Sequence, residues 1–172
     1  MIVEKTPLEG LLLIKPNVHE DKRGYFYENY RDELFEENGL PTNFRQDNQT
    51  KSVKGTLRGL HYQLKYPQGK LVRVSLGMVY DVAVDIRKTS PTFSQYFGVT
   101  LTDQDHLQMY IPPGFAHGFC VLSDTAIFHY KCTVIYHPED EFGIRWDDPQ
   151  ININWSITDP VISDRDLELP FL

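Results

Sequence analysis

Short segments in which apolar and polar residues alternate are the feature that most constrains the fold of this chain. In Met78–Arg87 (MVYDVAVDIR) every second residue from Met78 to Ile86 is apolar, and Leu71–Leu76 (LVRVSL) follows the same pattern. A period of two is typical of β-strands. The other segments predicted as strands are Tyr96–Leu101, Gln108–Ile111, Gly118–Leu122, Ala126–Thr133 and Ile151–Trp155. Gly and Pro separate many of these segments, so the pattern predicts an all-β sandwich or barrel.

Helical patterning is confined to one short segment. Acidic residues fill the first turn of Asp32–Asn38, and Gly39 supplies a stop signal. The chain has 172 residues and no internal repeat, which fits a single domain over residues 1–172 with its own hydrophobic core. The final segment, Thr158–Leu172, shows no clear periodicity, and its pattern alone indicates a surface tail.

Charge and apolar content narrow the possible partners and the location. The formal net charge of −7 argues against binding to nucleic acid or to an anionic membrane, although a local Arg and Lys cluster can still hold a small anion. The longest aliphatic run, Leu11–Ile14, is too short to cross a bilayer, and the N-terminal residues lack a secretory pattern. We therefore expect a cytoplasmic protein with Cys120 and Cys132 as buried free thiols.

The densest group of polar residues lies in Phe44–Leu64 (FRQDNQTKSVKGTLRGLHYQL). Strand parity places Gly59 and His61 on one face and Arg58 on the other. A bulge at Gly59 would bring Arg58 and His61 to the same site. A lone histidine in a strand is more often structural, but so many polar groups in a strand-rich segment are costly unless they meet a ligand.

A second pattern, Ile111–Phe119 (IPPGFAHGF), has the form P-x-G-x-x-H and presents His117 at the start of an apolar strand. This form resembles the second metal-binding motif of the cupin superfamily. The first cupin motif needs H-x-H followed by Glu, whereas this chain has His61-Tyr62-Gln63 and then Pro67 or Gln68. One imidazole and the carboxylate are missing, so the sequence predicts a cupin barrel without a metal site.

Four further positions have both a packing interpretation and a functional one. Lys70 follows Gly69 at a strand start, where a solvated lysine is common. Asp81 and Asp85 share a face and suit either pairing with Arg87 or support of a catalytic histidine. Tyr130 shares a face with Phe128 and Cys132, as a buried packing residue would. The residues alone leave these alternatives open.

Taken in order, several motifs resemble those of the dTDP-4-dehydrorhamnose 3,5-epimerase family. They are QDN, LRGLHYQ, QGKLVRV, DVAVDIRKTSPTF, IPPGFAHGF and WDDP, within a match that runs from Arg23 to the SDRD segment near the C-terminal end. The resemblance implies a cupin-type jelly roll, no metal or organic cofactor, and a nucleotide-sugar substrate. It also implies a homodimer in which N-terminal strands are exchanged.

The resemblance also implies roles for particular residues. His61 matches the family base, Asp166 its carboxylate partner, Tyr130 the acid and Lys70 the lysine near the keto oxygen. This changes the interpretation of the tail, since Asp166 must then return to the site. Residues similar to the substrate-binding set are Arg23, Glu28, Gln46, Asn48, Arg58, His117, Glu141 and Arg165. The chain departs from the family at Arg165, where relatives carry Lys, and at Gln49, where they often carry His.

The implied reaction inverts C3 and C5 of dTDP-4-dehydro-6-deoxy-D-glucose to give dTDP-4-dehydro-L-rhamnose. Both carbons flank a ketone, so a histidine base can remove their protons, and a second group must return a proton to the opposite face. Three alternatives stay open on the residues. They are an epimerase of one centre or of another nucleotide sugar, a metal-dependent cupin, and a cupin that binds the sugar nucleotide without turnover.

Overall fold

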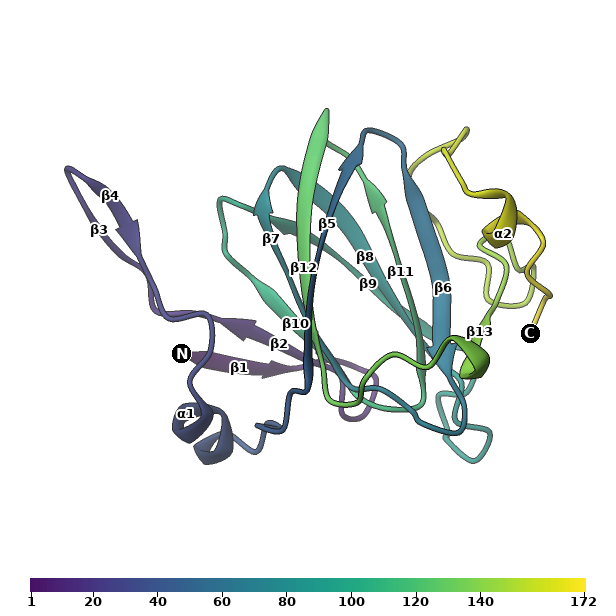
Figure 1. The fold of residues 1–172 in the computed structure, drawn as a ribbon, viewed down its shortest axis with the longest axis horizontal. Helices are drawn as coiled ribbons and strands as arrows, with labels where there is room; N and C mark the ends of the chain where they lie inside the picture. Colours follow the sequence, from purple (N-terminus) through teal and green to yellow (C-terminus); the bar gives the residue numbers. More distant parts are fainter.

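The computed structural model describes residues 1–172 and consists mostly of antiparallel strands (Figure 1). The strands are β1 (Ile2–Lys5), β2 (Leu12–Lys15), β3 (His19–Asp21), β4 (Gly24–Phe26), β5 (Gln46–Val53), β6 (Leu57–Gln63), β7 (Lys70–Leu76), β8 (Met78–Asp85), β9 (Tyr96–Thr102), β10 (Gln108–Ile111), β11 (Phe115–Val121), β12 (Thr125–Cys132) and β13 (Glu141–Gly143). The helices are α1 (Asp32–Glu37), α2 (Asp164–Leu167) and the 3-10 turn η1 (Pro138–Asp140). None of these helices is long and apolar enough to span a membrane.

Two sheets form the body of the molecule. One has six strands in the order β1-β2-β10-β7-β12-β5, and the other has five in the order β13-β6-β11-β8-β9. The hairpin β3–β4 pairs with neither sheet and projects from the body, whereas α2 lies at the opposite end beside β13 (Figure 1). This arrangement confirms the predicted all-β fold of the jelly-roll type.

The main core lies between the two sheets. It joins Val74 and Phe128 of the six-stranded sheet to Val79, Ala83 and Phe119 of the five-stranded sheet. Residues of the opposite parity on β8, such as Val82 and Val84, pack into a second core on the far face of the five-stranded sheet. The alternation of β8 therefore separates two buried faces, and Asp81 lies on the face that points into the sandwich.

Most predicted elements are confirmed, with boundaries that differ by a few residues. The predicted strand at Gly118–Leu122 begins earlier, at Phe115, and the predicted strand at Ile151–Trp155 is wrong. That segment is irregular, and Asn152 has a positive φ of 52°. Its apolar residues are nevertheless buried in the second core. The alternation there reflects burial of side chains without any strand pairing.

The bulge considered at Gly59 is present and shapes the site. The pairing of β6 with β11 shifts register between His117↔His61 and Phe119↔Arg58. Gly59 has a φ of +113°, and a Cβ there would lie 2.6 Å from the Cα of Gly118. Only glycine fits such a close approach of two backbones. As a result, Arg58 and His61 both reach the cavity described below.

Candidate active site

A cavity of about 710 Å³ opens between the two sheets beside the C-terminal tail. Side chains from both sheets and from α2 line it. Among the lining residues are Gln46, Asn48, Arg58, His61, Lys70, His117, Tyr130, Glu141, Arg165 and Asp166. All the predicted site residues therefore meet in one place except Arg23 and Glu28.

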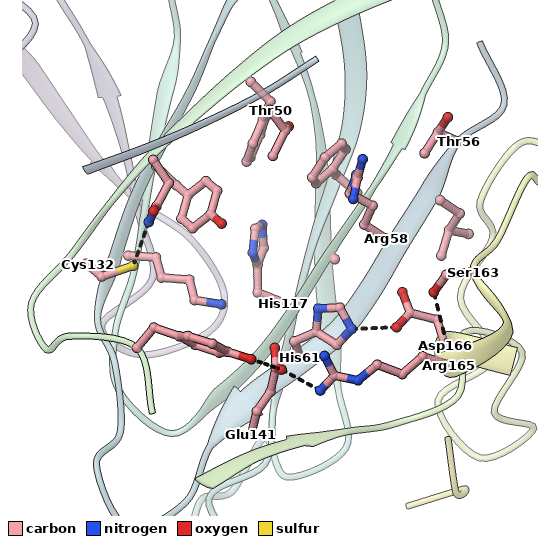
Figure 2. Close-up of a pocket in the computed structure, with 18 of the residues that line it drawn as sticks. Thr50, Thr56, Arg58, His61, His117, Cys132, Glu141, Ser163, Arg165 and Asp166 are labelled. Carbon is pink, nitrogen blue, oxygen red and sulfur yellow. Dashed lines mark hydrogen bonds and ion pairs between the residues drawn. The ribbon is translucent and has the colours of Figure 1, made fainter. Parts of the chain in front are cut away.

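His61 of β6 and Asp166 of the tail are in direct contact (Figure 2). The Nε2 atom of His61 lies 2.8 Å from Oδ1 of Asp166, whose side chain is nearly fully buried. The other carboxylate oxygen accepts a hydrogen bond of 3.1 Å from the backbone N–H of Gly59. A carboxylate only accepts, so in the neutral ring Nε2 carries the proton and Nδ1 keeps a free lone pair.

The environment of Asp166 favours its ionised form. Burial raises the pKa of this carboxyl, but the hydrogen bond from His61 and its charge outweigh that effect and lower the pKa overall. Ser163 caps α2, because its hydroxyl accepts a hydrogen bond from the backbone N–H of Asp166. The sequence pattern of the tail indicated a surface segment. In the structure this tail instead places a buried, ionised carboxylate against His61.

A second histidine–carboxylate pair lies deeper in the sandwich. The Nε2 atom of His117 lies 3.0 Å from both oxygens of Asp81. Burial lowers the pKa of His117, and Asp81 opposes this effect. Asp85 does not share that role, because it pairs with Arg87 at 2.7 Å. Asp85 therefore takes the predicted pairing with Arg87, whereas Asp81 contacts a histidine that lines the cavity.

Lys70 and Tyr130 enter the cavity from the six-stranded sheet. Lys70 forms no ion pair within 4 Å, and its burial lowers the pKa of the ammonium group, an effect that the nearby Cys132 and Glu141 oppose. Burial also raises the pKa of Tyr130. The phenol therefore stays neutral at working pH and retains a proton to donate.

Glu141 ties β13 to the tail at the mouth of the cavity. Its Oε2 atom accepts a hydrogen bond of 2.6 Å from the hydroxyl of Tyr136 and another from the guanidinium of Arg165 (Figure 2). Tyr136 was not predicted as a site residue, because nothing in its local sequence distinguishes it. Cys132 also lines the cavity, although the sequence indicated only a buried thiol; both cysteines are free and buried, as expected.

Arg23 and Glu28 do not line the cavity of the chain that carries them. The guanidinium of Arg23, at the tip of the hairpin β3–β4, pairs with Asp21 at 2.6 Å, and Glu28 lies 3.6 Å from Arg31. The reason is that the hairpin leaves the body and pairs with no other strand of the same chain. Their assignment to the substrate-binding set therefore stays a prediction that depends on a second copy of the chain.

No three side chains of the metal-binding types lie close enough together to hold a metal ion. His61 and His117 are each directed to a carboxylate instead.

Comparison with known proteins identifies the family. The profile of the dTDP-4-dehydrorhamnose 3,5-epimerase family matches residues 5–172. An epimerase of that name from Methanothermobacter thermautotrophicus is 52% identical over 165 residues, covering 94% of this chain and 89% of the relative. This chain belongs to the dTDP-4-dehydrorhamnose 3,5-epimerase family. It is therefore an isomerase that inverts C3 and C5 of a dTDP-linked 4-keto-6-deoxy sugar.

Solved structures of 3,5-epimerases agree with this assignment. An enzyme from Legionella pneumophila in complex with dTDP-4-keto-L-rhamnose superimposes with a TM-score of 0.96 at 48% identity, covering 99% of this chain and 92% of that one. An epimerase from Bacillus anthracis with TDP and pyrophosphate bound gives a TM-score of 0.97 at 41% identity, covering 99% of both chains. Both relatives therefore share the fold of this chain, and the first of them binds a nucleotide sugar.

Proposed function

We propose that His61, held by Asp166, is the base that removes the protons at C3 and C5 of dTDP-4-dehydro-6-deoxy-D-glucose. The observation that carries this proposal is the 2.8 Å contact between Nε2 and the carboxylate, since it leaves Nδ1 as the acceptor. The charged Asp166 also stabilises the imidazolium that forms when the proton arrives. Imidazole is the side chain best suited to general base catalysis near neutral pH.

Lys70 and Tyr130 have complementary roles in this proposal. Removal of either proton leaves an enolate with its charge on the former ketone oxygen, and the ammonium group of Lys70 stabilises that charge. Inversion then needs a proton on the opposite face of the carbon. Because His61 belongs to the five-stranded sheet and Tyr130 to the six-stranded sheet, the two groups approach the cavity from different walls. Tyr130 is the donor on the second face.

The remaining polar residues of the cavity are proposed to bind the substrate. Arg58 and Arg165 supply guanidinium groups suited to a diphosphate. Gln46 and Asn48 already form a hydrogen-bonded pair of 3.0 Å, which gives the cavity wall a fixed set of donors and acceptors. His117 and Glu141 complete the set. Because the net charge of the chain is −7, this local group of cations is what attracts an anionic ligand.

A homodimer in the cytoplasm is proposed as the working form. The hairpin β3–β4 exposes Tyr25 by 55% and Phe26 by 67%, and it pairs with no other strand of its own chain. Exchange of this hairpin would bring Arg23 and Glu28 to the cavity of the partner subunit. Sedimentation analysis tests this arrangement, and a dimer whose activity is unaffected by Arg23→Ala and Glu28→Ala would contradict the hairpin's role.

Incubation with dTDP-4-dehydro-6-deoxy-D-glucose in heavy water tests the catalytic proposal, with NMR to read deuterium at each carbon. We expect label at both C3 and C5 with the native enzyme. We expect a loss of label at both carbons with His61→Asn, because general base help contributes about 10²–10⁴-fold. Label at only one carbon would support an epimerase of a single centre, and full labelling by His61→Asn would remove His61 from the mechanism.

A further inference from the structure

The helix that carries Asp166 is too short to hold its own geometry. α2 has only four residues, Asp164–Leu167, and Asp166 is its only buried residue. An isolated helix of this length is unstable in water, because the conformational entropy lost in forming the first turn exceeds the free energy gained from its hydrogen bonds. Apart from the direct hydrogen bonds to Gly59 and His61, the position of the Asp166 carboxylate therefore depends on contacts on either side of the helix.

The segment from Val161 to Leu172, here called the strap, is fixed on the upstream side by the backbone. Val161 forms an isolated parallel bridge with Thr56. Its carbonyl accepts a hydrogen bond of 2.9 Å from the N–H of Leu57, and its N–H donates one of 2.8 Å to the carbonyl of Gly55. These bonds place the start of the strap beside β6, the strand of His61.

On the downstream side the strap is fixed by the WDDP motif and its surroundings. The N–H of Arg145 donates to the carbonyl of Pro170 at 2.8 Å. Leu169 packs so closely on Gly143 that a Cβ there would lie 2.5 Å from its Cδ1 atom. Gly143 is itself paired with His61 across β13 and β6. The downstream anchor is thus built on the neighbouring strand of the histidine it serves.

Asp148 is the charged residue of this anchor, and it does not line the cavity. It is only 2% exposed. Its Oδ1 atom accepts hydrogen bonds from the N–H groups of Gln150 and Ile151, at 2.8 and 2.9 Å. Its Oδ2 atom accepts one of 2.7 Å from the N–H of Leu172. One buried carboxylate therefore joins the turn after the motif to the strap.

We propose that Asp148 is a positioning residue for the reaction. It holds the downstream side of the strap so that Asp166 keeps its place against His61, and this inference rests on the proposed role of Asp166. Misplacement of a catalytic group by about 1 Å can cost about a hundredfold in rate. The WDDP motif then serves catalysis although none of its residues contacts the substrate cavity.

The variant Asp148→Asn separates the two functions of this carboxylate. Its amide oxygen can still accept from Gln150 and Ile151, while its NH₂ group faces the N–H of Leu172 and breaks the bond to the strap. We expect kcat to fall about tenfold to a hundredfold. The matched control is Asp147→Asn, since Asp147 is exposed and pairs with Arg145 at 2.8 Å. This control should retain native kcat.

A double-mutant comparison with Asp166→Asn distinguishes positioning from a general loss of structure. If Asp148 acts only through Asp166, the change Asp148→Asn lowers kcat in the native enzyme and adds nothing in the Asp166→Asn background. An equal loss in both backgrounds would overturn the proposal. Should Asp148→Asn not fold, Leu169→Ala loosens the same anchor without touching the turn, and the same pattern is expected.

The outcomes also separate this inference from the proposed function. If Asp166→Asn alone keeps native activity, the His61–Asp166 pair is not catalytic and both proposals fall. If Asp166→Asn is impaired while Asp148→Asn and Leu169→Ala both retain native kcat, only the role of the anchor is refuted. NMR of the His61 ring supplies an independent readout, because a loosened Asp166 should speed the exchange of the Nε2 proton with water.

Discussion

Replacing Asp166 with Asn should trap His61 in the wrong tautomer. In one orientation the new amide oxygen accepts from the N–H of Gly59, and the NH₂ group faces Nε2 of His61. That nitrogen must then accept, which moves the ring proton to Nδ1 and removes the lone pair needed by the base. In the other orientation the NH₂ group faces the N–H of Gly59, so two donors meet in a buried site.

The magnitude follows from these two orientations. Asp166 is 4% exposed, and leaving a buried donor unsatisfied costs about 1–3 kcal/mol. The productive orientation is therefore populated about 5-fold to 150-fold less than the unproductive one. The variant also lacks the negative charge that stabilises the imidazolium. Together these effects predict a fall in kcat of about 10²–10⁴-fold, which corresponds to about 3–5 kcal/mol in the activation free energy.

The assay is the rate of deuterium incorporation at C3 and C5, followed by NMR at saturating substrate. The matched control is Asp164→Asn, which changes an exposed carboxylate on the same helix and should leave kcat native. Thermal unfolding of both variants establishes that they fold. A value of kcat for Asp166→Asn within threefold of native would refute the tautomer argument.

Two further predictions concern stability. Asp85 is buried and held by Arg87, Ser90 and Thr92, whose hydrogen bonds outweigh burial and lower the pKa of the carboxyl. The fold therefore gains stability from the ionised form above about pH 4 and loses it as the pH falls, so Asp85→Asn should cost about 3 kcal/mol near pH 7 and less near pH 3 in urea unfolding. A difference independent of pH would contradict this. Gly118→Ala places a Cβ 2.7 Å from the carbonyl oxygen of Arg58; we expect a loss of about 1–3 kcal/mol with reduced kcat, and an unchanged urea midpoint would refute the proposed crowding.

Strand prediction succeeded where one side of a segment is consistently apolar and failed where burial had another cause. β7 and β8 could be located because alternation in sequence matches the two faces of a strand. The segment Ile151–Trp155 shows similar alternation, but its side chains enter the second core from an irregular chain. Periodicity reports which side chains are buried, and it does not report whether the backbone has a partner.

Several polar residues of the site could be recognised from local motifs, whereas the contacts between them could not. Nothing near His61 in the sequence identifies Asp166, which lies 105 residues away. The polar tail indicated a surface segment because only one residue of α2 is buried, and a single buried residue leaves no periodic pattern. The family resemblance implied that His61 and Asp166 pair, and the structure shows the two side chains 2.8 Å apart.

The amino-acid sequence by itself located strands β7 to β12 and showed that a complete cupin metal motif is absent, because each of these depends on residues close together in the chain. Only the tertiary structure decided that the strap closes on β6, that Asp81 and Asp85 take different partners, and that the hairpin β3–β4 leaves the body. The physical reason is that these outcomes depend on which surfaces meet after the sheets pack. Contacts of that kind join residues whose separation in sequence carries no periodic signal.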